Sequence, residues 1–263
     1  MVNILFSGCS FAAGTGLVNE KTHELHYANV LSKELFTNQA VINNIGGGGN
    51  SNLRIFLDTG IELVQKQYDF AFVGWTSYPR HVFWAGLEEY ESRRSISPTS
   101  THLVEHNGND ISFSKEFLKD FGDKFLLVHN THYDILDLVK YINILKGLAD
   151  SKNTKIYFLN NLCQWDQNYF DPVSDPIPTN LTNYTNKLLN SEHRDDAQIK
   201  NLYNKIHNDY KNSGSIQQNL WLNLYQSFAS MMIDYGNDKR HPGPLSHQRY
   251  GKFLASTFKK LSV

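Results

Sequence analysis

Two short motifs at opposite ends of the chain carry residue types that can do covalent chemistry. Ser10 directly follows an apolar run, and Asp238 and His241 stand three residues apart, just before Pro242. A serine hydroxyl becomes a nucleophile when a histidine removes its proton, and a neighbouring carboxylate holds that histidine in the required tautomer. Either motif alone is usually an ordinary turn. Together they predict a nucleophile (Ser10), a base (His241) and an orienting group (Asp238).

Groups this far apart in sequence can meet only if the fold brings both ends of the chain together. Open parallel α/β sheets do so, because the carboxyl ends of their strands share one edge. The chain alternates short apolar runs with segments of helical periodicity, as such a sheet requires. The predicted strands are residues 2–7, 40–45, 69–73 and 155–159, and the predicted helices lie around 28–35, from 52 onward, at 135–148 and at 248–261.

These motifs resemble the SGNH (GDSL-type) hydrolase family, in which four short blocks contribute Ser, Gly, Asn and His to one active site. Residues 6–14 (Phe-Ser-Gly-Cys-Ser-Phe-Ala-Ala-Gly) are similar to the first block, with Ser10 in the nucleophile's place. Residues 238–242 (Asp-Lys-Arg-His-Pro) match the last block closely, with Asp238 and His241 in its two roles.

The second block is similar to residues 44–51 (Asn-Ile-Gly-Gly-Gly-Gly-Asn-Ser), which open into a predicted helix. In the family a glycine of this block donates its backbone N–H to the oxyanion hole. Gly49 takes that role if Asn44 is matched to the family's leading Asn, and Gly48 takes it if the match shifts by one. Four glycines in a row also allow positive φ angles and a close approach of the backbone to a ligand.

The third block departs from the family pattern. The family has Gly-x-Asn-Asp, whereas residues 74–77 read Gly-Trp-Thr-Ser. Loss of one oxyanion donor typically costs about a hundred- to a thousand-fold in rate. The Thr76 hydroxyl stands where the Asn is missing and is our candidate replacement. Arg80 either reaches the site or pairs with a surface carboxylate, and the candidate substrate-binding residues are Gly48, Asn50, Trp75 and Arg80.

The resemblance implies one domain over residues 1–263, built as a three-layer α/β/α sandwich. Its central sheet is expected to be mainly parallel, with the strand order of flavodoxin. Two stretches exceed this minimal fold, at about 80–125 and 163–220. Both follow predicted strand ends, the edge where α/β enzymes keep their sites. They are interpreted either as a lid or substrate-binding lobe, or as surfaces for homo-oligomer or assembly contacts.

The implied reaction is hydrolysis of an acyl ester through an acyl-enzyme, with carbohydrate O-acetyl groups or small acyl esters as the suggested substrates. The oxyanion would be stabilised by the backbone N–H groups of Ser10 and Gly49 and by Thr76. No metal or organic cofactor is required. The altered third block keeps a second hypothesis open, in which the same fold is a weakened or non-catalytic binding module of a viral or cell-surface assembly.

Composition narrows the partners and the setting. A net charge of −1 and a pI near 6.8 give no basic excess for nucleic acid. No apolar run reaches the ~18 residues of a membrane span, and the first apolar stretch ends at Ser10 rather than at a signal-peptide cleavage site. We expect a protein of the cytoplasm or another soluble compartment, and a virion component is also compatible.

Several other reactive residue types have simpler interpretations. Two cysteines, Cys9 and Cys163, are too few for a disulfide framework, and Cys9 is interpreted as a core residue rather than a thiol nucleophile. His247 is expected to pack at the start of the last helix. His129 and His132 have metal-ligand spacing, but no third ligand follows at a recognisable interval, so no metal site is predicted.

Overall fold

The computed structural model describes residues 1–37, 39–76, 81–84, 93–96, 103–105, 131–162, 221–223 and 226–261. Its contacts divide the chain into two units, Met1–Gln164 with Asn219–Val263, and Trp165–Gln218. All described residues belong to the first unit. The predicted 163–220 insertion, Cys163, Arg80 and His129 lie outside the described residues.

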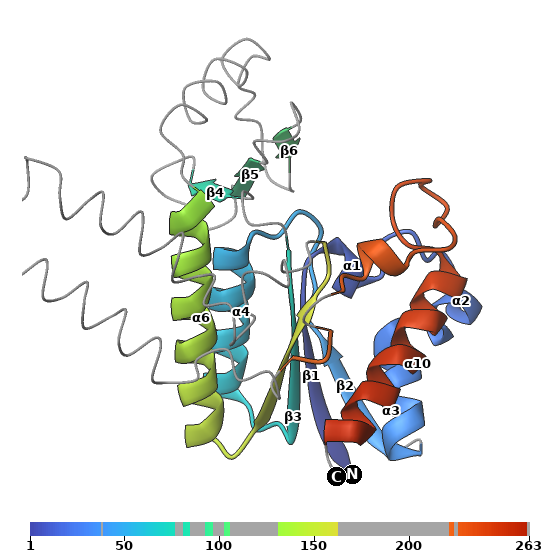
Figure 1. Cartoon of the computed structure of the whole chain (residues 1–263), viewed down its shortest axis with the longest axis horizontal. Helices are drawn as coiled ribbons and strands as arrows, with labels where there is room; N and C mark the ends of the chain where they lie inside the picture. The colour runs from blue at the N-terminus through green and yellow to red at the C-terminus, as the bar shows by residue number, and fades with distance from the viewer. Residues whose placement is uncertain are drawn as a thin grey trace, which may run out of the picture. The chain divides into compact units, whose positions relative to one another are not determined.

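A four-stranded parallel sheet forms the centre of this unit (Figure 1). Its order is β2-β1-β3-β7, the flavodoxin-like order that the sequence predicted. The register sets Phe6 beside Asn44 on one neighbour and Phe72 on the other. A parallel bridge between Phe158 and Trp221 adds one more contact along the β7 edge. The strands are β1 (Val2–Gly8), β2 (Ala40–Asn44), β3 (Phe70–Trp75) and β7 (Lys155–Asn160).

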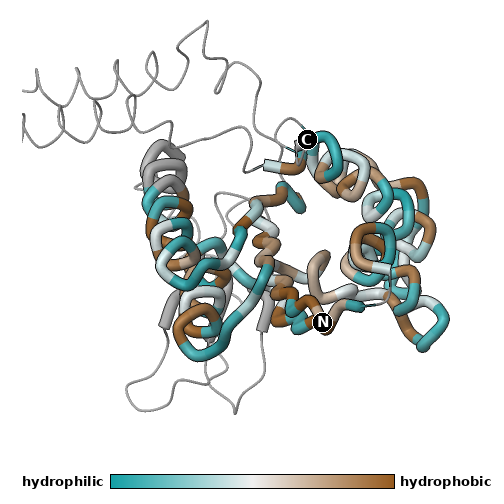
Figure 2. The backbone as a smooth tube through the Cα atoms, turned by 90° about the horizontal axis from the view of Figure 1, so that it is seen from below, coloured by the Kyte–Doolittle hydropathy of each residue, from teal (hydrophilic) through white to brown (hydrophobic). Residues whose placement is uncertain are grey.

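Helices cover both faces of the sheet, which confirms the three-layer prediction. Helices α3 and α10 pack together on one face, and α4 and α6 pack together on the other (Figure 1). Figure 2 looks along the strands and shows the sheet between the two helical layers. The helices are α1 (Ser10–Ala13), α2 (Glu20–Glu24), α3 (Tyr27–Phe36), α4 (Asn52–Gln65), α6 (Thr131–Ser151) and α10 (Pro244–Leu261), with a 3-10 turn η2 at Ala229–Met231.

Alternation along β1 explains why both faces are filled. Phe6 points toward α3 and α10, where its ring meets Tyr27 edge-on at 5.9 Å and stacks on Phe72 at 5.0 Å. Ser7 points the other way, and its hydroxyl hydrogen-bonds the Thr59 hydroxyl of α4 at 2.8 Å. Successive strand residues face opposite sides, so one apolar run supplies both layers of the core.

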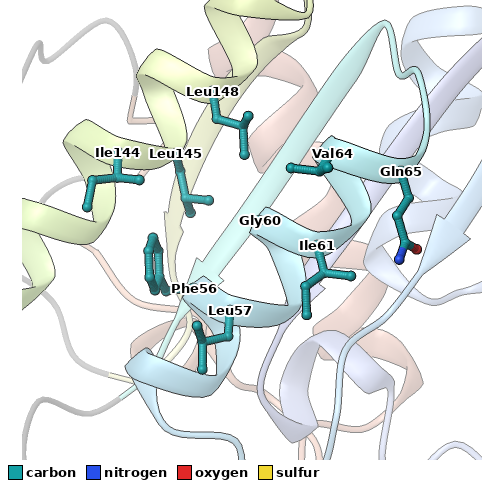
Figure 3. A pocket seen from close by; sticks show the side chains of 9 residues that line it. All are labelled: Phe56, Leu57, Gly60, Ile61, Val64, Gln65, Ile144, Leu145 and Leu148. Atoms are coloured by element: carbon teal, nitrogen blue, oxygen red, sulfur yellow. The ribbon is translucent and has the colours of Figure 1, made fainter.

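A groove runs between α4 and α6 on the second face. Figure 3 shows its apolar lining, in which Phe56 and Leu57 of α4 lie across from Ile144 and Leu145 of α6. Gly60 also lines this groove, and an added Cβ there would make ordinary contact with Leu145 at 3.9 Å. The groove lies within the helical layer, and the candidate catalytic residues lie at the strand ends.

One feature of the first insertion was not predicted. Three short antiparallel strands occur in the order β4-β5-β6, with bounds His81–Trp84, Arg93–Ile96 and Leu103–Glu105. No alternation of apolar and polar residues marks this segment, because the middle strand reads Arg-Arg-Ser-Ile. Its pairing depends on backbone hydrogen bonds, and these leave no mark in a hydrophobicity pattern.

Candidate active site

Ser10 is the first residue of α1, at the carboxyl end of β1. It is 6% exposed, and the helix ends after four residues at Gly14, which takes a left-handed φ of 72°. The turn into α1 depends on Gly8, where an added Cβ would lie 2.7 Å from both the Ala12 Cβ and the Gly74 carbonyl oxygen. This tight turn directs the chain away from the sheet at the serine.

The glycine run docks onto that turn through its backbone. Gly47 donates its N–H to the Gly8 carbonyl at 3.0 Å, and the Asn50 Nδ2 donates to the same oxygen at 3.1 Å. A Cβ at Gly46 would lie 2.6 Å from the Ala13 nitrogen, so only glycine fits. Gly49 takes a left-handed φ of 69°. The side chain of Asn50, a candidate substrate-binding residue, therefore hydrogen-bonds the backbone of the first block.

Asn44 adds a second link between these two blocks. Its Nδ2 donates to the Ala12 carbonyl at 2.7 Å, while its Oδ1 accepts the Gly46 N–H at 3.0 Å. One side chain thus holds both the helix that carries Ser10 and the start of the glycine run. Gly48 and Gly49 are partly exposed at this edge.

The third block is buried. Trp75 is 2% exposed and stacks on Phe158, with the ring centroids 5.8 Å apart, so its ring lies in the core. Thr76 is also 2% exposed, and its backbone N–H donates to the Asn52 Oδ1 at 2.9 Å. Among the described residues, the Thr76 hydroxyl has no hydrogen-bond partner.

The last block forms a hydrogen-bonded carboxylate and imidazole pair. The Asp238 Oδ2 lies 2.5 Å from the His241 Nδ1, while the Asp238 Oδ1 accepts the backbone N–H groups of Arg240 and His241 at 3.0 Å each. Burial acts to raise the pKa of Asp238, but these hydrogen bonds and the imidazole outweigh it and lower that pKa to about 2. The carboxylate therefore stays ionised at neutral pH.

The turn after α1 places this pair. Gly236 packs on Gly16 so closely that a Cβ on Gly236 would lie 2.8 Å from the Gly16 Cα, and Asn237 donates its N–H to the Gly16 carbonyl. The ring of Phe11 meets the His241 ring edge-on at 5.8 Å.

The first and last blocks therefore meet at Phe11 and Gly16, at the end of the sheet where α1 lies (Figure 1). No hydrogen bond joins the Ser10 hydroxyl to the His241 ring in the described part of the chain. The imidazole is held by its Nδ1, which leaves its Nε2 as the atom that can exchange a proton with a serine or a substrate.

Two other histidines lie beneath this site and are buried. His247 is fully buried within the first turn of α10, stacks on Tyr27, and accepts the Tyr27 N–H at 3.4 Å. Burial lowers the pKa of His247 to about 2 and that of His26 to about 4. Both rings are neutral at physiological pH. This environment fits the packing role expected for His247.

Asn161 is a site residue that sequence reasoning missed. It is fully buried just after β7, and its Nδ2 reaches across β3 to within 4.0 Å of the Cys9 sulfur. An added Cβ on Gly74 would lie 2.2 Å from that nitrogen, and one on Gly8 would lie 3.0 Å from it. Two strand-end glycines therefore make space for one amide. The only signal was the pair of asparagines that follows the strand predicted at 155–159, and polar residues are common at such positions.

The described residues also bear on Cys9, on metal binding and on membrane-spanning helices. Cys9 is a free, fully buried thiol, as its interpretation as a core residue requires. Within the described ranges, no cluster of three His, Cys, Asp or Glu side chains could hold a metal ion. No helix in those ranges is both long and apolar enough to cross a membrane.

Solved structures similar to this chain carry esterase and lipolytic names. The crystal structure of TesA is 12% identical, with a TM-score of 0.47, over 98% of this chain and 99% of that one. A member of the lipolytic protein G-D-S-L family from Veillonella parvula DSM 2008 is 10% identical (TM-score 0.41; 99% and 97% covered). A catalytic mutant of Axe2, an acetylxylan esterase from Geobacillus stearothermophilus, is 11% identical, with a TM-score of 0.42, over 99% of this chain and 93% of that one. No family model and no curated protein matches the sequence.

Proposed function

We propose that this chain is a serine ester hydrolase that works through an acyl-enzyme. The observation that carries the proposal is the Asp238–His241 pair, which is held against Phe11 and Gly16 next to the helix that begins with Ser10. The carboxylate accepts the Nδ1 proton and favours the tautomer in which Nε2 acts as the base.

In the proposed reaction the Ser10 oxygen attacks the acyl carbon while its proton passes to the His241 Nε2. The tetrahedral intermediate collapses, the bond to the alcohol oxygen breaks, and the alcohol leaves with that proton. Water then attacks the acyl-enzyme, gives a proton to His241, and releases the acid and the serine. Backbone N–H groups of Ser10 and Gly49 and the Thr76 hydroxyl would stabilise the oxyanion.

The substrate class proposed is a polar acyl ester, with O-acetylated carbohydrate as the leading candidate. Residues 163–220 are rich in Asn, Asp and Tyr, and residues 80–125 contain Phe83, Trp84 and Tyr90. Aromatic rings stack on sugar faces, and Asn side chains bond hydroxyl groups. Both stretches follow predicted strand ends, where additions to an α/β sheet border its site.

The test is turnover of p-nitrophenyl acetate and a panel of acetylated sugars, together with labelling by a serine-directed phosphonate. Ser10→Ala should abolish both signals, and His241→Ala should be nearly as damaging, because residues of one catalytic unit are strongly non-additive. Cys9→Ala is the matched control at the neighbouring position and should retain both. Wild-type protein that neither labels nor turns over any ester would favour a non-catalytic binding module.

A further inference from the structure

The side chain of Asn52 joins the second block to the third. Its Oδ1 accepts the Thr76 backbone N–H at 2.9 Å, and its Nδ2 lies 3.5 Å from the Thr76 carbonyl oxygen, to which it donates. Asn52 is 6% exposed and Thr76 is 2% exposed. Both ends of one buried amide are thus directed at the backbone of one residue, 24 positions along the chain.

Helix α4 does not need this amide. Asn52 is its first residue, but the cap is Ser51, whose hydroxyl accepts the Arg54 N–H at 3.2 Å and whose carbonyl accepts the Ile55 N–H at 2.9 Å. Many residue types are tolerated at the first helical position once the cap is in place. The amide of Asn52 is therefore explained by Thr76 and not by the helix.

Holding the backbone of Thr76 leaves its hydroxyl as the unused group. That hydroxyl is buried and has no hydrogen-bond partner among the described residues. Most buried polar groups in native proteins are hydrogen-bonded, so an unpaired one calls for an explanation, and a catalytic role is one such explanation. Threonine is stiff at χ1, so a fixed backbone also limits where the hydroxyl can point. Asn52 follows Gly49 by three residues, and it therefore ties Thr76 to the same loop.

We propose that Asn52 is a positioning residue that holds Thr76 so that its hydroxyl donates to the developing oxyanion. Two residues thereby replace the asparagine missing from the third block. Thr76 supplies the hydrogen-bond donor, and Asn52 fixes the position of the Thr76 backbone. Asn52 acts through Thr76 and does not itself touch the substrate. This inference rests on the proposed ester hydrolysis.

A double-mutant cycle on p-nitrophenyl acetate tests this role. Thr76→Val should lower kcat about a hundred-fold, as expected for loss of an oxyanion donor. Asn52→Ala should lower kcat by about tenfold or more with KM changed little, because small misplacements of catalytic groups are costly. The kcat of the double variant should lie within about threefold of the kcat of Thr76→Val, because both substitutions remove the same oxyanion hydrogen bond. Losses that multiply would overturn the proposal.

Ser51→Ala is the matched control, because it removes the α4 cap and leaves the Asn52–Thr76 contact in place. It should lower Tm but keep kcat within about twofold of wild type. Hydrogen exchange at the Thr76 amide gives a readout independent of activity. That amide should be protected in the wild type and in Ser51→Ala, and should exchange much faster in Asn52→Ala. Equal exchange in all three would overturn the proposal.

If Asn52→Ala does not fold, Asn52→Asp replaces it. The acceptor for the Thr76 N–H remains, but ionisation puts a negative charge behind the oxyanion donor. The ratio of its kcat to that of the wild type should fall as pH rises through the titration of the new carboxyl, and a flat ratio would overturn the role. Wild-type protein without turnover would overturn the proposed function and this role together. Wild-type turnover that Asn52→Ala leaves intact would overturn this role alone.

Discussion

At the scale of single residues, asparagine side chains make the links around the candidate site. Asn44 and Asn50 tie the glycine run to the first block, and Asn52 ties α4 to Thr76. Asn161 reaches the same region from the end of β7. An amide both donates and accepts, so one side chain can fix two backbone groups at once. Such links preorganise a site before substrate binds, which is what electrostatic stabilisation of an oxyanion requires.

Asp238→Asn is expected to lower kcat by roughly a thousand- to ten-thousand-fold, with little change in KM. The substitution keeps the size of the side chain but removes the charge that holds the His241 Nδ1 proton and stabilises the imidazolium. Steady-state kinetics on p-nitrophenyl acetate, with a melting curve to confirm folding, measures the effect.

Asp234→Asn is the matched control in the same loop. Asp234 accepts hydrogen bonds from the Leu245 and Ser246 backbone N–H groups at the start of α10, and within the described ranges no hydrogen bond joins its side chain to His241. Its substitution should lower Tm and leave kcat within about twofold of wild type. Equal losses of kcat in both variants would show that the loop, and not the Asp238 charge, is what matters.

At the scale of elements, the sheet was more predictable than the contacts that complete its edge. The strands were predicted from apolar runs, and all four occur within a few residues of their expected ends. Asn52 and Asn161 were missed because their partners lie 24 and 152 positions away, at Thr76 and Cys9. A side chain's local pattern holds no information about such partners. The glycine contacts were missed for the same reason, since Gly236 meets Gly16 only in the folded chain.

Gly60→Ala should stabilise the protein by about 0.5 to 1 kcal/mol, or raise Tm by about 1 to 4 °C. Gly60 lies inside α4, and an added Cβ would make ordinary contact with Leu145 at 3.9 Å (Figure 3). Urea unfolding of the variant measures the change. Gly251→Ala is the contrasting helical glycine, because its Cβ would lie 2.7 Å from the Val30 Cβ and 2.8 Å from the Tyr27 carbonyl. A gain in stability for Gly251→Ala would contradict the observed close approach of α3 and α10.

At the scale of the whole molecule, one aromatic cluster links the core to the candidate site. His247 contacts Tyr27 and His26, and Phe228 contacts His247, Tyr250 and Phe11. Phe11 in turn meets His241. The ends of the chain are therefore packed against each other through rings that must stay neutral. Because burial lowers the pKa of both histidines in this cluster, we expect the cluster to make the fold sensitive to acid.

The free energy of unfolding should fall steeply as pH drops from about 6.5 toward 4. Burial lowers the pKa of His26 to about 4 and that of His247 to about 2 in the folded chain. Between these values and the ordinary histidine pKa of about 6.5, the unfolded chain binds protons at both histidines and the folded chain does not. Near pH 5 the two rings together contribute a slope of roughly 2 to 3 kcal/mol per pH unit. His247→Phe keeps a ring against Tyr27 and Phe228 but removes one titrating group, so it should roughly halve that slope. Urea unfolding of both proteins between pH 5 and pH 8 measures it, and an unchanged slope would show that His247 is protonated in the folded state.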